Sequence, residues 1–497
     1  MTRGRLLRFL PLAFPLALAG ACSNGASSSE PAPLDAGNDA AVDDTAEPED
    51  IGPPSPPDWD RAVTPPPDDD AQKQRAACGY KAGALAGETQ GSSHPTGKAI
   101  PIEHVVVIVQ ENRSFDHYFG RLREAGHPDA EVPPAGWSNP RLDGTPVFPY
   151  RDQQLCLVDP SHSWNGSHRE WNDGKMDGFV IANDHHDDIP PGGTEEMIKG
   201  DRAMSYYEPA DLPFMYWAAD EFAIADHYHC SVLTSTWTNR MYLFAASSFG
   251  RISNKPPDTG SALTIFDELQ MRRVSWKFYV SATPTFAIFI KQFLAYKDFH
   301  FVPIEQYYED LKNGVLPQVA FVDGSYGNVA FDETETDEHP PASMQVGQAF
   351  LARATKALMA STAWPSSVLF ITYDEHGGLA DHVPPPAACP PDSTPPELQP
   401  DSAPGGYDRL GMRVPMLIIS PWARKGIIGH HVYDHTSITR FIEARFALPA
   451  MSARDANAEV PWEMFDFSKA RTDLPAVPDV PVDAAKLAAC KKIFGVP

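Results

Sequence analysis

The chain has 497 residues, 42% of them hydrophobic, and its 66 acidic side chains outnumber 40 lysines and arginines to give a net charge of −26. This excess of negative charge excludes non-specific binding to nucleic acid or to anionic lipid surfaces. Neutral or zwitterionic substrates and soluble esters are the ligands that such a surface admits.

The N-terminus has the pattern of an export signal. Residues 1–22 begin with three arginines, continue in an apolar run and end in Leu18-Ala-Gly-Ala-Cys22. They are a secretory signal peptide whose end is similar to a bacterial lipobox, although Ala19 stands where leucine is usual. We therefore expect an exported bacterial lipoprotein at the outer membrane, the cell surface or the periplasm, anchored through Cys22. The alternative is a secreted protein that is cleaved nearby.

The rest of the chain divides by composition. Residues 23–75 are rich in proline and acidic residues, and such a segment cannot bury enough apolar surface to fold. We predict a disordered linker there and a folded part over residues 76–497. Length alone allows two or three domains in this part, and we favour one large α/β domain with long insertions.

Two short apolar runs end in polar side chains. Residues 105–109 lead to Glu111 and Asn112, and residues 368–373 lead to Asp374 and Glu375. Both runs read as buried parallel strands, and ligands of open α/β sheets bind beyond the carboxyl ends of the strands. If both strands lie in one sheet, these four oxygen-bearing side chains meet and suit a hard divalent cation such as magnesium, manganese or calcium. The alternative is an ordinary strand end with a solvated acidic turn.

A third segment places a hydroxyl before an apolar helix. A strand-like stretch from residue 226 passes through Ser235-Thr-Trp-Thr-Asn-Arg240 into the apolar run of residues 241–246. The N-terminus of a helix attracts phosphate through its free N–H groups and its dipole. Thr236 is therefore a candidate nucleophile, and the alternative is a simple helix cap.

Further elements complete the predicted α/β pattern. Residues 319–322 and 415–419 read as strands, residues 344–360 as a helix and residues 384–404 as a surface loop. Five cysteines follow Cys22, at positions 78, 156, 230, 389 and 490, and export permits disulfides between them. The odd number leaves at least one free, for which we choose Cys230. The sequence does not determine how the other four pair, and a bond between Cys78 and Cys490, which would tie the two ends of the domain together, is one possibility.

Taken together, eight segments between about residues 100 and 450 resemble the phosphoesterase family of bacterial phospholipases C, plant non-specific phospholipases C and related acid phosphatases. They are Glu111-Asn-Arg-Ser-Phe-Asp116, Asp159-Pro-Ser-His-Ser-Trp164, Asp211-Leu-Pro-Phe214 with Ala219-Asp-Glu-Phe-Ala223, Ser235-Thr-Trp-Thr-Asn-Arg240, Ser275-Trp-Lys-Phe-Tyr279, Asp337-Glu-His-Pro-Pro341, Thr372-Tyr-Asp-Glu-His-Gly-Gly378 with Asp381-His-Val-Pro384, and Asp434-His-Thr-Ser437.

The resemblance implies an alkaline-phosphatase-like α/β fold and a set of roles. One divalent metal ion would be held by Glu111, Asn112, Asp374 and Glu375, with Thr236 as both nucleophile and ligand. The phosphoryl group would be contacted, or the leaving oxygen protonated, by His162, His339 and His382, and Asn239 and Arg240 would bind substrate. The chain departs from the family at Thr238, where proline is usual, so that a second hydroxyl lies near the nucleophile.

The chemistry of these residue types is phosphate-ester hydrolysis through a phosphothreonine. We expect phospholipase C activity on phosphatidylcholine-type lipids, with acid phosphatase activity as the alternative. Acyl chains would need an apolar approach, for which the aromatic residues at 206–207, 214–217 and 286–293 are candidates. The alternative is that these residues belong to the core. A sulfatase-like enzyme lacks support because the chain has no Cys/Ser-x-Pro-x-Arg element. An inactive surface-binding lipoprotein is disfavoured because the five predicted metal ligands are all present.

Overall fold

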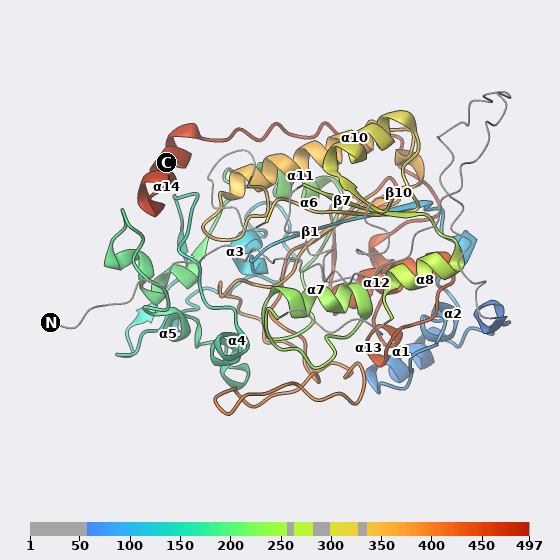
Figure 1. Ribbon diagram of the computed structural model, residues 1–497, viewed down its shortest axis with the longest axis horizontal. Helices are drawn as coiled ribbons and strands as arrows, with labels where there is room; N and C mark the ends of the chain where they lie inside the picture. Colours follow the sequence, from blue (N-terminus) through green and yellow to red (C-terminus); the bar gives the residue numbers. More distant parts are fainter. Residues whose placement is uncertain (1–56, 256–262, 282–298, 327–334, 497) are drawn as a thin grey trace, which may run out of the picture. The chain divides into compact units, whose positions relative to one another are not determined.

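A central sheet organises the part of the chain that the computed structural model describes, which is residues 57–255, 263–281, 299–326 and 335–496. Within these ranges the sheet has eight strands in the order β12-β6-β11-β10-β1-β9-β7-β8 (Figure 1). Their bounds are β1 His104–Gln110, β6 Ala223–Ala225, β7 Trp276–Val280, β8 Phe301–Pro303, β9 Val319–Val322, β10 Ser367–Tyr373, β11 Met416–Ile419 and β12 Ile427–Gly429. Only β11 runs antiparallel to its neighbours, which confirms the predicted mostly parallel α/β sheet.

Strands β1 and β10 form the middle of the sheet. They are parallel neighbours over their whole length, from the pair His104 and Ser367 to the pair Gln110 and Tyr373. Every residue of β10 and all but the first of β1 are buried, as their continuous β-branched and aromatic composition requires between two layers of helices. The structure confirms both predicted strands and places their carboxyl ends at one edge.

Helices cover both faces of the sheet. Figure 1 shows α10 Ile304–Asn313 and α11 Met344–Met359 on one side of the strands, with α7 Thr236–Ala245, α8 Ile265–Arg272 and α12 His435–Phe446 on the other. The predicted helix over residues 344–360 is thus α11. The other α-helices are α1 Asp68–Ala76, α2 Ala86–Thr89, α3 Phe115–Phe119, α4 Trp164–Trp171, α5 Phe179–Asn183, α6 Pro213–Glu221, α13 Ala453–Ala456 and α14 Ala484–Phe494.

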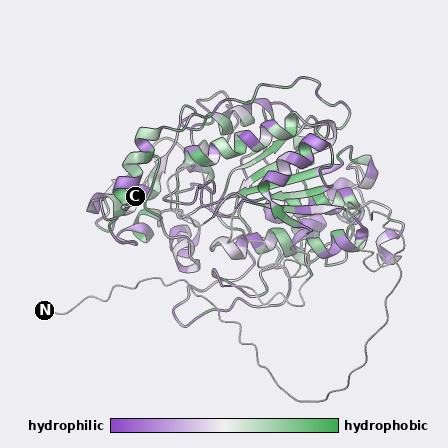
Figure 2. Ribbon diagram, turned by 45° about the horizontal axis from the view of Figure 1, so that its top comes forward, coloured by the Kyte–Doolittle hydropathy of each residue, from purple (hydrophilic) through white to green (hydrophobic). Residues whose placement is uncertain are grey.

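The hydrophobic core lies in the sheet and on the inner sides of these helices, and Figure 2 shows the central strands as the most apolar part of the ribbon. Residues 384–404 contain no helix or strand, as predicted. Two small ribbons lie outside the main sheet, formed by β2 Asn139–Pro140 with β3 Pro146–Val147 and by β4 Tyr150–Arg151 with β5 Ser205–Tyr206. Among the described residues no helix is long and apolar enough to cross a membrane.

The structure moves the boundary of the predicted linker. Residues 57–75 were expected to be disordered, but they include a short 3-10 helix, Pro57–Asp60, and most of α1. Arg75 in α1 is buried, donates to the carbonyl of Thr89 and forms an ion pair with Glu459. These contacts hold residues 57–75 on the folded unit, so the charged composition alone placed the boundary too late.

The structure determines the disulfide pairing that the sequence left open. Cys78 is bonded to Cys389 and Cys156 to Cys490, so the possible bond between Cys78 and Cys490 does not form. Cys230 is free and buried, as predicted. The pairing depends on which loops the fold brings together, and the spacing of the cysteines carries no information on that.

Candidate active site

Four polar side chains lie where β1 and β10 end. The backbone N–H of Asp374 donates to the carbonyl of Gln110 at 3.0 Å, and that of Asn112 donates to Asp374 Oδ1 at 3.2 Å. Glu111, Asn112, Asp374 and Glu375 are all at most 4% exposed. The sheet edge therefore brings the predicted pairs together as the strand pattern indicated.

A glycine makes this close approach possible. Asn112 has a φ of +60° and Gly377 a φ of +61°, both in the left-handed region. A Cβ added to Gly377 would lie 2.6 Å from the Cβ and the carbonyl oxygen of Asn112. The glycine after His376 is thus required for Asn112 to reach its place beside Asp374.

Thr236 is the first residue of α7, and its hydroxyl points to the carboxylate edge. Its Oγ1 donates to Glu375 Oε1 at 3.2 Å, whereas the neighbouring Thr238 Oγ1 is buried and has no hydrogen-bond partner in the described structure. Ser235, not Thr236, is the N-cap residue. Of the two hydroxyls, Thr236 is therefore the one that contacts a predicted metal ligand.

The residues before Thr236 form an irregular segment and not the expected strand, because β6 ends at Ala225. Asn239 shapes its end: its Oδ1 accepts from the N–H of Val232 at 3.0 Å, and its Nδ2 donates to the carbonyl of Thr234 at 2.7 Å. The amide of Asn239 is thus engaged within the protein, where it fixes the approach to α7. Its predicted contact with substrate stays a prediction.

Arg240 lies between the two strand ends. Its Nε donates to Asp374 Oδ2 at 3.0 Å, its Nη2 lies 3.4 Å from Glu111 Oε1, and its guanidinium lies 4.9 Å from the ring centre of Tyr326. The side chain is 2% exposed. Arg240 therefore supplies a fixed positive charge that offsets part of the carboxylate repulsion, and its predicted role in substrate binding is likewise still a prediction.

His162 and His339 lie close together, with their rings in a T-shaped arrangement. Their ring centres are 5.7 Å apart, and His162 Nε2 lies 3.3 Å from Asn112 Nδ2 and 3.8 Å from Glu375 Oε1. Each ring places its Nδ1 within hydrogen-bond distance of a backbone carbonyl, that of Pro160 for His162 and that of Pro340 for His339. A protonated Nδ1 in each ring leaves Nε2 available for substrate.

Asp159 joins these two histidines, although it was named only within a motif and not as a site residue. Donor atoms of Asp159, His162 and His339 lie within 4.8 Å of one another. Burial opposes protonation of His339, but the negative charges of Asp159, Glu111 and Asp337 outweigh it and raise the pKa of His339 to about 9. Its position three residues before His162 was the signal that could have identified Asp159.

His382 belongs to a different cluster from the other predicted catalytic residues. Its Nδ1 lies 2.7 Å from Asp116 Oδ2 and its Nε2 lies 3.1 Å from Glu131 Oε1. Arg413 binds Asp116 and Asp381 in the same cluster, at 2.7 and 2.9 Å. Although donor atoms of Asp116, Asp381 and His382 lie within 4.8 Å of one another, Arg413 already supplies their positive charge. The described contacts of His382 thus tie it to this ion-pair network.

Two other histidines support the strand end. His376 Nε2 lies 2.7 Å from Glu170 Oε2, and both side chains are buried. His435 at the start of α12 has its Nε2 2.7 Å from the carbonyl oxygen of Asp374. Both contacts hold the segment that carries Asp374 and Glu375.

The donor set fits a divalent cation. Burial and the charge of Asp374 raise the pKa of Glu111 and of Glu375 well above the ordinary range, because one guanidinium does not balance three buried carboxyl groups. Asn112 Oδ1 and Glu375 Oε2 are buried without a hydrogen-bond partner in the described structure. These oxygens are ligands of the kind that hard cations take. Among the described residues these carboxylates do not form a group with all donor atoms within 4.8 Å, since Arg240 lies between Glu111 and Asp374.

Comparison with known proteins identifies the family of this chain. The model of the Phosphoesterase family matches residues 102–449. Phospholipase C B of Mycobacterium tuberculosis is 32% identical over 78% of this chain and 82% of its own length. Non-specific phospholipase C1 of Arabidopsis thaliana is 33% identical, over 74% of this chain and 72% of its own.

Among solved structures, a protein in the alkaline phosphatase superfamily from Vibrio parahaemolyticus has a TM-score of 0.33 at 8% identity, covering 79% of each chain. The family model covers well over half of the sequence and includes all the strand-end residues described above. The chain belongs to the Phosphoesterase family and is a hydrolase that acts on phosphate ester bonds.

Proposed function

We propose that this hydrolase is a phospholipase C, which cleaves phosphatidylcholine-type lipids to diacylglycerol and a phosphorylated headgroup with Thr236 as nucleophile. The observation that carries the proposal is the hydrogen bond from Thr236 Oγ1 to Glu375 Oε1, at the edge where Glu111, Asn112 and Asp374 also lie. A hydroxyl at a helix N-terminus beside buried carboxylates combines a nucleophile with a proton acceptor and a site for phosphate.

A divalent cation held by Glu111, Asn112, Asp374, Glu375 and Thr236, with magnesium, manganese or calcium favoured by the oxygen donors, would neutralise phosphate charge and favour the alkoxide. Thr236 gives its proton to Glu375, with which it already shares a hydrogen bond, and its Oγ1 bonds to phosphorus. As the bond from phosphorus to the glycerol oxygen breaks, His339 donates a proton to that oxygen.

The second half of the cycle releases the headgroup. Water attacks the phosphothreonine and gives a proton to the neutral His339, the bond from phosphorus to Thr236 breaks, and Glu375 returns the proton to Thr236. His162, whose Nε2 faces Asn112 and Glu375, orients the phosphoryl oxygens. Each residue thus ends in the protonation state in which it began.

Three observations support a phospholipid over a phosphomonoester. Thr236 is a threonine, which the resemblance associates with the phospholipases and not with the acid phosphatases. Relatives at 32 and 33% identity are named phospholipases C. The net charge of −26 disfavours multiply charged anions and admits a zwitterionic headgroup. We further propose export as a lipoprotein anchored at Cys22, which would place the enzyme at a membrane.

The test compares phosphatidylcholine vesicles with a soluble phosphomonoester, with and without chelator, and identifies lipid products by mass spectrometry. We expect diacylglycerol and phosphocholine, and loss of both after chelation. Cleavage of the phosphomonoester without diacylglycerol from any phospholipid would show an acid phosphatase instead.

A further inference from the structure

Residues 132–150 form an exposed stretch that is unlike the rest of this acidic chain. We call it the apolar rim. Its only charged residues are Arg141 and Asp143. Leu142, Phe148 and Tyr150 are 73%, 53% and 41% exposed, which is unusual for large apolar side chains gathered within nine residues.

The local fold explains why these side chains face solvent. Strands β2 and β3 pair antiparallel, with Asn139 opposite Val147 and Pro140 opposite Pro146. Asn139 and Val147 are buried, so Pro146 and Phe148, one residue to either side of Val147, point outward. Leu142 lies in the turn of this hairpin, which is closed by the bond from Arg141 N–H to the Thr145 carbonyl.

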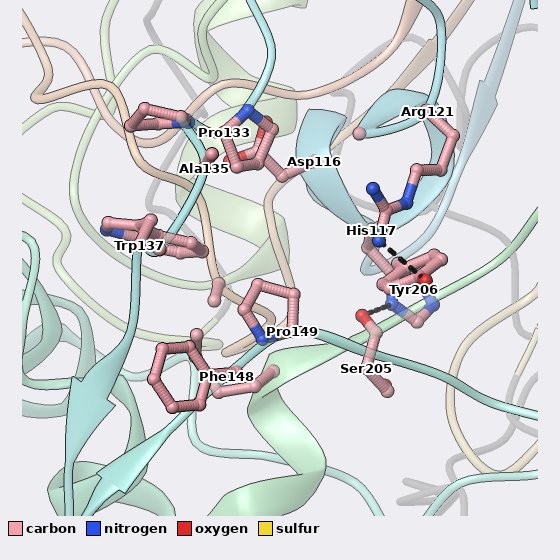
Figure 3. Close-up of a pocket in the computed structure, with 15 residues that line it drawn as sticks. Asp116, His117, Arg121, Pro133, Ala135, Trp137, Phe148, Pro149, Ser205 and Tyr206 are labelled. Carbon is pink, nitrogen blue, oxygen red and sulfur yellow. Dashed lines mark hydrogen bonds between the residues drawn. The ribbon is translucent and has the colours of Figure 1, made fainter. Parts of the chain in front are cut away.

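The rim is also one wall of a cavity of about 210 Å³. Figure 3 shows Pro133, Trp137, Phe148 and Pro149 on one side of this cavity and Arg121, His117 and Tyr206 on the other. The Arg121 guanidinium lies 4.3 Å from the centre of the Tyr206 ring. The Trp137 ring centre lies 6.1 Å from that of His382. The cavity therefore has an apolar wall and a polar wall, as an amphiphilic ligand requires.

The charges on the rim are balanced locally. Arg141 forms an ion pair with Asp201, and the carboxylate of Asp143 accepts from the Thr145 N–H inside the turn. With one positive and one negative side chain the rim has no net charge, whereas the whole chain has −26. An uncharged apolar surface on an acidic protein favours a zwitterionic lipid surface over an anionic one.

We propose that the apolar rim docks this enzyme on the surface of a phosphatidylcholine bilayer. Leu142 and Phe148 enter the boundary between headgroups and acyl chains, and Trp137 and Tyr150 lie at headgroup level, where amphipathic rings are favoured. The cavity beside Trp137 and Phe148 shelters the part of a lipid that has left the bilayer. The proposal rests on the phospholipid substrate proposed above.

This inference replaces one of the predicted apolar approaches. Phe214 and Tyr216 of α6 are buried in the core, so the segment at 214–217 does not offer acyl chains an open surface. The segment at 286–293 lies outside the described residues. Tyr206 lines the cavity, opposite the rim.

The experiment separates docking from chemistry. Binding to phosphatidylcholine vesicles is measured by flotation of the full chain. The parent protein carries Thr236→Ala, which leaves the lipid intact, and Cys22→Ser, which removes the proposed anchor. The rim variant is Leu142→Asp with Phe148→Asp, and the single change Leu142→Asp is tested beside it. The matched control is Leu474→Asp with Phe299→Asp, whose side chains are 60% and 54% exposed elsewhere. Turnover of a soluble choline phosphodiester is measured in the same variants with Thr236 restored.

We expect Leu142→Asp to lower vesicle binding about tenfold and the rim variant to lower it about a hundredfold, because each buried apolar side chain contributes about a factor of ten. The control should bind as the parent does, and both Leu142→Asp and the control should turn over the soluble diester at the parent rate. The proposal is overturned if the parent does not bind, if the rim variant binds as well as the parent, or if rim and control lose binding equally. Vesicle binding without lipid hydrolysis would contradict the proposed phospholipase activity while leaving the docking surface supported.

Discussion

Gln110 and Tyr373 are partners at the last register position of two adjacent parallel strands, so Glu111 and Asp374 leave the sheet side by side. This pairing joins two segments more than 250 residues apart in the sequence and gives the site its carboxylates. Thr236 and Arg240, one turn apart on α7, then contact Glu375 and Asp374. The proposed nucleophile and the fixed positive charge thus lie on one helix.

Removing a carboxylate of the strand end should abolish turnover without unfolding the protein. Glu111→Gln and Asp374→Asn each remove a charge from the oxygen set that we propose holds the cation. We expect loss of activity and of bound metal, measured by elemental analysis of the purified protein. In metal-free protein, the melting temperature of Glu111→Gln should be no lower than that of the wild type, because the substitution relieves repulsion between buried carboxylates. Full activity in either variant would contradict the proposed metal site.

The nucleophile can be identified by comparing two neighbouring threonines. Thr236→Ala should lower the rate by about 10⁴-fold or more, as expected for removal of a covalent nucleophile. Thr236→Ser should retain part of the activity because it keeps a hydroxyl at the same backbone position. Thr238→Ala is the matched control, since Thr238 Oγ1 makes no hydrogen bond in the described structure. If Thr238→Ala were as inactive as Thr236→Ala, the assignment of Thr236 as the nucleophile would be wrong.

His382 should contribute stability that is lost at alkaline pH. Burial opposes the protonation of His382. Asp116, through its charge and its hydrogen bond, outweighs burial and raises the pKa of His382; Asp381 also raises this pKa and Arg413 lowers it. Because the folded pKa lies above the unfolded value of about 6.5, the contribution is complete below pH of about 6.5 and disappears as pH rises through the folded pKa.

The measurement is the melting temperature of wild type and His382→Gln from pH 5 to 9. We expect a larger difference at pH 5 than at pH 9, and a constant difference would show that protonation of His382 does not stabilise the fold. The rate of His382→Gln on a soluble ester tests its predicted catalytic role at the same time.

Gly377 should be essential for a steric reason that a second glycine isolates. Gly377→Ala forces an L side chain to a φ of +61° and places its Cβ 2.6 Å from Asn112. Gly83→Ala imposes a comparable φ of +88°, but no atom lies within 4 Å of the added Cβ. Both changes should destabilise the fold by about 1 kcal/mol or more through backbone strain. Only Gly377→Ala should also lose activity, and equal activities of the two variants would contradict the need for close approach.

The sequence by itself determined the strand ends and their chemistry. Short, continuous and β-branched apolar runs that stop at Glu111 and Asp374 are typical of buried strands with polar side chains at the edge, so the parallel sheet and the carboxylate pairs could be predicted. The hydroxyl of Thr236 at a helix start could be predicted for the same local reason. These features depend on residues close together in the chain.

The tertiary structure decided what depends on distant segments. Arg240 lies between Glu111 and Asp374, and His382 turns to Asp116, because charged groups in a buried site take the nearest partner that folding supplies. Three further features depend likewise on which surfaces come together: the pairing of the disulfides, the folding of residues 57–75 onto the domain and the exposure of Phe148. Local patterns set strand and helix, but contacts between segments far apart in the chain are chosen by the packing of the whole molecule.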